Sequence, residues 1–564
     1  MQTVRRLYLY GMSGITLGVL LTGLNNLFVV VFHAFGLGRG ALVGDSGGDR
    51  EQLSLAIALT VVGLLVWTVH WLLIERSLRP SNPAAGEEST SPIRALYLSL
   101  VLAVLLVFGV LAGVQLLQHL ARLLLGVSRT GGFEFFEIDT GAAMATVLVT
   151  GLAWLYHAAI RRRDLDASPM SGGAAWIPRV YLYGAALLGL VMTALNIGTL
   201  LRLALGTAGG PTPDFVDPDF ARRSAADAVA GIVGWGIVFG GHWWYATSLL
   251  RGEGWRAASE RRARLRLVYY VVAIAASAIA TVVLVWQSAS AALGVMLGVE
   301  RDFASESLLV SIAGPLLALL PWIAAWFVHQ RWMVDEAGTS DVPDRPASVG
   351  RLAAAAVGLV GISAFAGGAA GAIGLLLDIV LGGNRIEFDV WRPELAGFLA
   401  AGLVGVVLWL WNWANLQSRR AADPEGEARS TVRRAYLLVI VGVALLVSLA
   451  SLALLLYRLF NAILGVDLFQ NAISTVSSAL GALLVVGALA AYHGIAERRD
   501  RALRDATPEG SGEIVAETAP VPAPPATVER TLVLRGSSAG EVDAAVAALR
   551  AGLPPGVELD ERPA

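Results

Sequence analysis

The sequence predicts an all-α fold: a polytopic bundle of transmembrane helices followed by a small α+β tail. Three observations support this prediction. Of the 564 residues, 56 % are hydrophobic and only 15 % are charged, whereas a soluble protein has about 25 % charged residues. The apolar residues come in blocks of about 20 to 30, the length that crosses a bilayer core of about 30 Å. The blocks also repeat along the chain, and a water-soluble globular protein is excluded.

The residue types present exclude several chemistries. The chain has no cysteine, so disulfides, a thiolate nucleophile, cysteine-ligated zinc and iron–sulfur clusters are excluded. All basic residues are arginine, which excludes a Schiff-base or phosphate-loop lysine. A net charge of −2 argues against nucleic acid as a partner, because nucleic-acid binding needs a clustered basic face. We expect no cofactor.

The first helix of each repeat begins with an arginine followed by aromatic and aliphatic residues, as in Arg179-Val180-Tyr181-Leu182-Tyr183. Successive markers are 89, 85, 87, 85 and 82 residues apart. A period near 85 held over six units indicates an internal repeat. The six markers are Arg5, Arg94, Arg179, Arg266, Arg351 and Arg433.

Each repeat continues with a second apolar helix, which ends in aromatic residues and a histidine or asparagine before a basic cluster. The first copy reads Trp67-Thr68-Val69-His70-Trp71 and precedes Arg76. Six two-helix hairpins therefore give twelve spans. Their expected limits are 7–35, 52–74, 94–125, 140–160, 179–205, 224–250, 266–298, 305–330, 352–383, 394–416, 435–465 and 471–496.

The domain organisation follows from these hairpins and from a change of composition near residue 505. A disordered linker rich in Pro, Ala, Glu and Ser is expected over 505–527. A small β-α-β tail over 528–564 contains expected strands at Val528–Arg535 and Val557–Leu559 and a helix at Ser538–Arg550. It is too small for a dependable core of its own, so three alternatives are open: it is marginally stable, it pairs with a cytoplasmic protein partner, or it docks on the membrane domain. The hairpins occupy 1–90, 91–175, 176–262, 263–347, 348–429 and 430–504.

The arginines predict the orientation. Most lie at the N-terminus and between hairpins, whereas the loops within hairpins are acidic, as at Asp214, Asp217 and Asp219. Because basic loops stay in the cytoplasm, both termini are predicted to be cytoplasmic, in the inner membrane of a bacterium. The segment after Arg6 is too long for a signal peptide and is expected to be an uncleaved first membrane helix.

The motifs at the two ends of the hairpin carry a family resemblance. Tyr8-Leu9-Tyr10 and Tyr181-Leu182-Tyr183 open helices, and Trp67 to Trp71 close one. With these motifs, the chain over residues 1 to about 500 resembles a bacterial integral-membrane family of repeated two-helix hairpins, a domain of unknown function. The resemblance implies no activity. The fifth copy departs from the pattern, with Ala354 in place of the tyrosine and Asn412 and Asn415 in place of histidine.

Five of the seven histidines recur at one place, near the arginine-rich end of the second helix. They could ligate a metal or relay protons. We favour an interfacial belt, because each lies close to an arginine cluster among tryptophans and no carboxylate accompanies it at a regular spacing. The predicted belt comprises Trp67, His70, Trp154, His157, His242, Trp326, His329, Trp411 and His493.

Polar residues within the spans are the candidate intramembrane sites. Amides are not ionisable, and hydrogen bonding between helices is their common use, so helix packing is the favoured role. Asp378 is a short carboxylate near the outer end of its span, where an ion pair with Arg385 is the simplest role. The candidates are Asn25, Asn26, Gln115, Asn196, Gln287 and Asp378.

Small residues and prolines add two expectations about packing. Gly367 and Gly371 form a GxxxG pair, and Gly368 and Ala372 repeat the spacing, which predicts close helix contact. Pro315 and Pro321 in the eighth span predict a bend.

Three classes of function remain open. We expect a structural or partner-binding membrane protein without a catalytic site. The alternative is a transporter or channel for a small solute, although the repeats are all inserted in the same direction, unlike the inverted repeats of many carriers. A membrane enzyme is least expected, since no paired carboxylates, Ser/His/Asp set or metal-ligand spacing is present.

Overall fold

The structure, a computed structural model, divides into two parts, Met1–Ala506 and Thr507–Ala564. The second contains helix α17 (Ala539–Ala551) at the predicted position, whereas the predicted linker, apart from its first two residues, and both predicted strands lie outside the described residues. The structure describes residues 2–37, 48–79, 81–82, 85–127, 139–167, 172–208, 219–251, 255–299, 307–338, 345–382, 390–464, 472–506 and 538–551.

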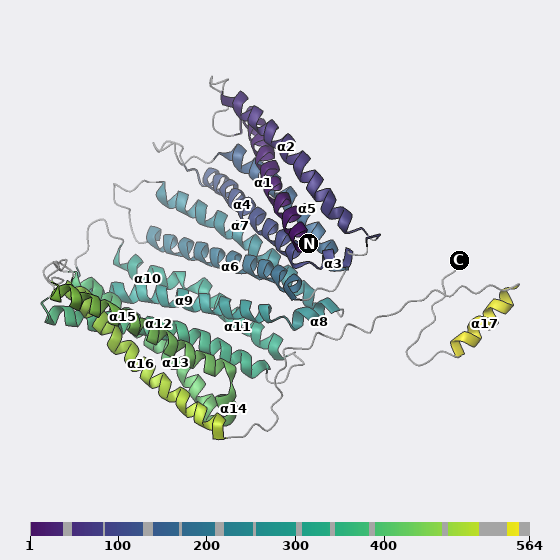
Figure 1. Ribbon diagram of the computed structural model, residues 1–564. Coiled ribbons are helices and arrows are strands. Elements are labelled where there is room, and N and C mark those ends of the chain that lie inside the picture. Colours follow the sequence, from purple (N-terminus) through teal and green to yellow (C-terminus); the bar gives the residue numbers. More distant parts are fainter. Residues whose placement is uncertain are drawn as a thin grey trace. The chain divides into compact units, whose positions relative to one another are not determined.

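Residues Met1–Ala506 are almost entirely helical where the structure describes them, and no strand is present in the described residues. Twelve of the described segments are long and apolar enough to cross a membrane, which confirms the predicted all-α transmembrane fold and gives the architecture of a multi-pass membrane protein (Figure 1). The helices of this part are α1 (Gln2–Ala34), α2 (Gly48–Ser77), α3 (Ala85–Ser89), α4 (Pro92–Leu124), α5 (Thr140–Ala167), α6 (Gly172–Ala208), α7 (Phe220–Ser248), the 3-10 helix η2 (Leu249–Arg251), α8 (Trp255–Arg261), α9 (Arg264–Met296), α10 (Leu308–Ala318), α11 (Leu320–Gly338), α12 (Arg345–Val380), α13 (Trp391–Ala422), α14 (Pro424–Arg429), α15 (Thr431–Ile463) and α16 (Ala472–Ala506).

The long helices pack as consecutive hairpins in chain order, from purple α1 and α2 to green α15 and α16 (Figure 1). The first helix of each hairpin also packs on the second helix of the next hairpin: α1 on α5, α4 on α7, α6 on α10, α9 on α13 and α12 on α16. Within the described residues, no contact of similar extent joins the first hairpin to the last. The hairpins therefore form an open row.

Glycine brings α12 and α13 into backbone contact. A Cβ added to Gly368 would collide with the backbone nitrogen of Gly402, and one added to Gly371 would collide with the ring of Phe398. Gly367, which sequence reasoning paired with Gly371, faces open space. The close contact therefore uses Gly368 and Gly371, because neighbouring glycines point in different directions around the helix and the GxxxG spacing alone does not identify the buried side.

The eighth span is interrupted, as its prolines predict. Helix α10 ends at Ala318 and α11 begins at Leu320. Because Pro321 has no backbone N–H, it cannot donate a hydrogen bond to the carbonyl of Leu317, and the helix breaks there. Both pieces pack on α9.

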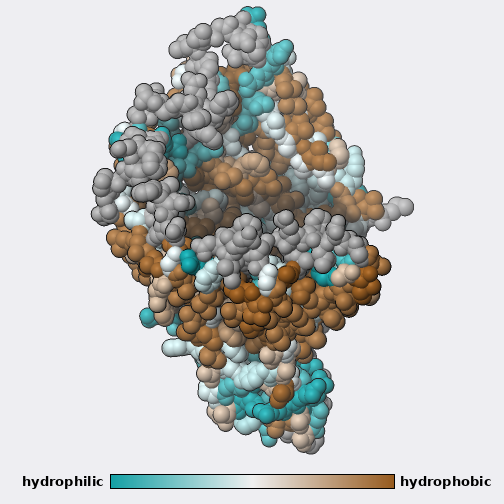
Figure 2. All heavy atoms as spheres, turned by 90° about the vertical axis from the view of Figure 1, so that its left-hand side faces the viewer, coloured by the Kyte–Doolittle hydropathy of each residue, from teal (hydrophilic) through white to brown (hydrophobic). Residues whose placement is uncertain are grey.

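Large apolar side chains remain exposed on the part Met1–Ala506, among them Ile237 and Leu446, each 69 % exposed. Figure 2 shows hydrophobic side chains gathered over a broad part of one face. Apolar patches of this extent mark contact with a membrane or a partner, in agreement with the twelve spans.

Candidate functional site

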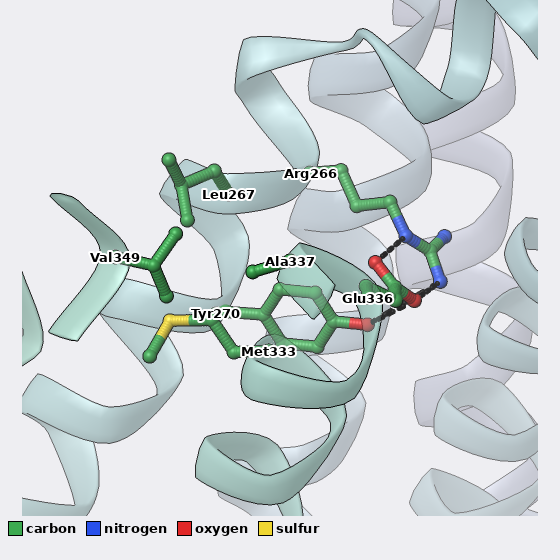
Figure 3. A pocket seen from close by; sticks show the side chains of 7 residues that line it. All are labelled: Arg266, Leu267, Tyr270, Met333, Glu336, Ala337 and Val349. Atoms are coloured by element: carbon green, nitrogen blue, oxygen red, sulfur yellow. Dashed lines mark hydrogen bonds and ion pairs between the residues drawn. The ribbon is translucent and has the colours of Figure 1, made fainter. Parts of the chain in front are cut away.

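A cluster of buried charged and aromatic side chains lies at the arginine-rich end of the helices, where α9 and α11 meet (Figure 3). Arg266 donates from Nε to Oε2 of Glu336 at 2.8 Å. Its Nη1 donates to the hydroxyl of Tyr183 at 3.3 Å and to the carbonyl of Ala246 at 3.1 Å. Tyr270 donates its own hydroxyl hydrogen to Oε1 of Glu336 at 2.6 Å. The guanidinium thus joins four helices, α6, α7, α9 and α11.

Aromatic rings cover the charged pair. The guanidinium carbon of Arg266 lies 5.0 Å from the centre of the Trp243 ring, within the range of a cation–π contact. Trp243 in turn stacks on Tyr269 and on Trp332, each at 5.0 Å between ring centres. These rings shield the guanidinium, whose side chain is 3 % exposed, whereas that of Glu336 is 33 % exposed.

A second arginine of the cluster holds the short connecting helix. Arg179, near the start of α6, donates from Nε to Oε2 of Glu260 on α8 at 2.8 Å, and its Nη2 donates to Ser259 at 2.9 Å. The hydroxyl of Tyr183 donates to the other oxygen of Glu260. Tyr183 therefore connects the two ion pairs, since it also accepts from Arg266.

The same arrangement occurs twice more in the chain. Arg94 donates to Asp164 at 2.6 Å, and Arg433 donates to Asp500 at 2.7 Å. Each of these arginines is 1 % exposed and lies over a tryptophan, at 5.9 Å from Trp71 and 5.5 Å from Trp413 respectively. The cluster is therefore a feature of the repeat.

The connecting-helix pair is repeated as well. Arg6 donates to Glu88 on α3 at 2.8 Å, and Arg351 donates to Glu427 on α14 at 2.6 Å. The third copy lacks the tyrosine that connects the two pairs, because Ala355 stands four residues after Arg351. There, Arg433 donates instead to the carbonyl of Leu416 and to Gln417.

Each cluster takes residues from two consecutive hairpins, so the structural unit is a pair of hairpins. We call α1–α5 unit 1, α6–α11 unit 2 and α12–α16 unit 3. From one unit to the next, Arg94, Arg266 and Arg433 are 172 and 167 residues apart. That spacing is twice the period near 85 that the arginine markers predicted.

The free space at the unit 2 cluster is small. A pocket of about 10 Å³ lies between Arg266, Tyr270, Met333, Glu336 and Val349 (Figure 3), enough for about one water molecule. In the described part of the chain, no group of three or more His, Asp or Glu side chains could hold a metal ion. The cluster therefore pairs arginines with carboxylates of neighbouring helices.

Comparison with known proteins agrees with a threefold repeat. A family model described as a domain of unknown function, DUF5671, matches residues 6–151, 179–324 and 326–503. The chain belongs to the DUF5671 family. No curated protein and no solved structure was found to match it. The first two DUF5671 matches each begin at the arginine that binds the connecting helix, Arg6 or Arg179.

The structure separates the predicted belt of this DUF5671 chain into two groups. Trp411 is 76 % exposed, and Trp67, His70, Trp154, His242 and Trp326 are half-buried. In contrast, the interior of the helix contacts holds His157, His329 and His493, which are at most 1 % exposed. These three side chains are enclosed by the protein, a difference that the sequence does not show, because it indicates their depth along the helix but not the side they occupy.

The half-buried histidines contact tyrosines of their own hairpins. Nε2 of His242 lies 3.1 Å from the hydroxyl of Tyr181, which also accepts from the indole of Trp154 at 3.0 Å. Nε2 of His70 lies 3.4 Å from the hydroxyl of Tyr8. In unit 3 of the DUF5671 chain, Asn412 occupies this position and bonds to its own helix.

The predicted polar candidates are not brought together into one site. Asn25 accepts from Thr146 on α5 at 3.0 Å, and Asn196 bonds to its own helix and packs on Gly231 of α7. Asp378 is fully buried in the last turn of α12, and Arg385 lies outside the described residues. Asn26 and Gln287 are half-buried, and Gln115 is exposed.

Sequence reasoning missed the six carboxylates of the clusters. A usable signal was present, because each acid follows its arginine at a nearly constant distance: 82, 81 and 76 residues for the connecting-helix pairs and 70, 70 and 67 for the buried pairs. The acids are Glu88, Asp164, Glu260, Glu336, Glu427 and Asp500.

Proposed function

We propose that this chain is a non-catalytic membrane scaffold, in which three clamped four-helix units present a cytoplasmic tail to a protein partner. The observation that supports it is the threefold repetition of a buried arginine paired with a carboxylate contributed by a different helix. In a membrane, hydrophobic burial does not drive helices together, so packing and polar contacts have to do so. Three such clusters would give a rigid array.

The uses of the intramembrane polar residues also favour a scaffold over a transporter. Asn25 bonds across to Thr146, a packing contact between helices, and Asn196 bonds within its own helix. Arg122 near the other end of the helices pairs with Asp227 at 2.8 Å. These polar groups are already paired within the protein.

Solute flux distinguishes the two functions. The purified chain would be reconstituted into liposomes that contain a pH-sensitive dye and radiolabelled sucrose. A scaffold should leave proton and sucrose permeability equal to those of protein-free liposomes. Flux of either that depends on the protein would favour the transporter alternative, for the solute observed.

The tail is tested by deletion. We expect the full chain, cross-linked in its native cells, to capture a cytoplasmic protein that a chain ending at Ala506 does not capture. The shortened chain keeps all twelve spans. Identical captured proteins would count against a partner-binding tail.

The membrane and orientation belong to the same proposal. We place the arginine-rich end, with both termini, on the cytoplasmic side of a bacterial inner membrane, because basic residues are retained there. The clusters would then lie at the cytoplasmic face, the same side as the tail.

A further inference from the structure

Units 1 and 3 each contain a second polar group, one to two helical turns away from the arginine cluster toward the middle of the helices. In unit 1 it consists of Trp67 from α2, Tyr97 from α4 and His157 from α5. In unit 3 the equivalent residues are Trp409 from α13, Tyr436 from α15 and His493 from α16. Each triad thus takes its residues from three helices.

The polar atoms of both triads are buried and close together. Tyr97 and His157 are 7 % and 1 % exposed, with ring centres 6.2 Å apart, and the indole nitrogen of Trp67 is buried as well. The indole N–H, the hydroxyl and Nε2 of the imidazole make no hydrogen bond to another described residue.

Unit 3 repeats this arrangement closely. Tyr436 and His493 are 2 % and 0 % exposed, again with ring centres 6.2 Å apart, and Trp409 lies 5.9 Å from His493 between ring centres. Its three polar atoms are also buried without a hydrogen-bond partner among the described residues. Buried polar groups normally have a hydrogen-bond partner. Because the same three atoms lack one at equivalent places in units 1 and 3, we interpret each triad as a binding site for a small polar molecule.

The backbone fixes the chemistry of each histidine. Nδ1 of His157 lies 2.8 Å from the carbonyl of Ala153, and Nδ1 of His493 lies 2.9 Å from that of Leu489. A carbonyl only accepts, so Nδ1 carries the hydrogen and Nε2 of the neutral ring is an acceptor. Each triad therefore offers one N–H donor, one acceptor nitrogen and one hydroxyl that can do either.

Unit 2 shows what happens when the indole donor is missing. Phe239 stands where Trp67 and Trp409 stand in the other units. There the hydroxyl of Tyr269 bonds directly to Nε2 of His329 at 2.9 Å, and their ring centres are 5.6 Å apart. The tyrosine and histidine satisfy each other, and no third group is needed.

We propose that units 1 and 3 each bind one buried water molecule between the tryptophan, tyrosine and histidine, and that unit 2 does not. The water accepts from the indole N–H, donates to Nε2 and exchanges a hydrogen bond with the tyrosine hydroxyl. Three hydrogen bonds are typical of a buried water. The three units then share the arginine–carboxylate pair and differ in whether the tyrosine and histidine are bridged by a water molecule, a distinction that goes beyond the scaffold role.

The proposal can be tested on the full chain in lipid nanodiscs labelled with 15N-histidine. Water-edited solid-state NMR measures polarisation transfer from bound water to imidazole Nε2. We expect transfer to His157 and His493 and at least a threefold weaker transfer to His329. Equal transfer to all three, or none to His157 and His493, would overturn the proposal.

A single variant adds an internal control. Trp67→Phe copies unit 2 into unit 1, so transfer to His157 should fall to the level of His329 while His493 in the same sample is unchanged. Unchanged transfer to His157 would contradict the assigned donor. If this variant does not fold, the comparison of the three histidines in the unaltered chain still decides whether the waters are bound.

Discussion

Arg266 is the single residue whose removal should weaken unit 2 most. Arg266→Ala leaves Glu336 charged without its main partner and removes the donor to Tyr183. Removing one partner of a fully buried ion pair costs about 3–5 kcal/mol. Because the Glu336 side chain is 33 % exposed and water can solvate part of its charge, we expect a smaller but measurable fall in the free energy of unfolding. Thermal or denaturant unfolding of the detergent-solubilised protein measures it.

Two further variants calibrate that result. Arg331 on α11 has a side chain that is 83 % exposed and pairs only within its own helix, so Arg331→Ala should change stability by less than about 0.5 kcal/mol. Arg266→Lys keeps the charge but loses the two-pronged geometry and should fall in between. Equal stabilities for the alanine variants at 266 and 331 would show that the cluster does not hold the helices together.

For the helix pair α12 and α13, neighbouring glycines give opposite expectations. Gly368→Ala should force the helices apart, since its Cβ would collide with the backbone of Gly402. We expect a loss of about 1–3 kcal/mol, as for other overpacked contacts. Gly367→Ala, which faces open space, should be neutral or slightly stabilising because alanine favours the helix. Melting temperatures of the two variants test this, and equal losses would contradict it.

Helices were the most predictable level of this structure. Blocks of apolar residues determine where spans lie, and Pro321 determines where the eighth span breaks. The side of a helix that is buried was not predictable, because His157 and His70 share a depth and differ in surroundings. The ion pairs were missed for a different reason: Arg266 and Glu336 lie 70 residues apart, and only the repetition of that spacing in the other units indicates that they belong together.

The grouping of the hairpins into pairs was hidden for a related reason. Odd and even hairpins look alike because both begin with arginine and end with aromatic residues, which gives the period near 85. Their roles differ once they pack: the odd hairpin supplies Trp243 and the even one supplies Arg266 and Glu336. Odd and even hairpins can therefore be told apart only by which residues their side chains contact in the folded protein.

Across the whole molecule, the open row predicts that units respond independently. Arg94 and Arg433 belong to units 1 and 3, which share no partner in their clusters. Losses in unfolding free energy from Arg94→Ala and Arg433→Ala should therefore add within about 0.3–0.5 kcal/mol. A double-mutant cycle checks this, provided that each variant unfolds reversibly. A larger coupling would mean that the two clusters interact energetically in spite of their separation.

Orientation is the last property that can be tested on the whole chain, and the absence of cysteine makes it direct. Single cysteines would be introduced by Asp217→Cys, between α6 and α7, and by Glu425→Cys, on the exposed side of α14. Because arginine-rich ends remain in the cytoplasm, a membrane-impermeant maleimide should label position 217 in cells with a permeabilised outer membrane and position 425 only after lysis. Labelling of 425 but not 217 before lysis would place the arginine clusters and the tail outside, and a cytoplasmic partner would then be excluded.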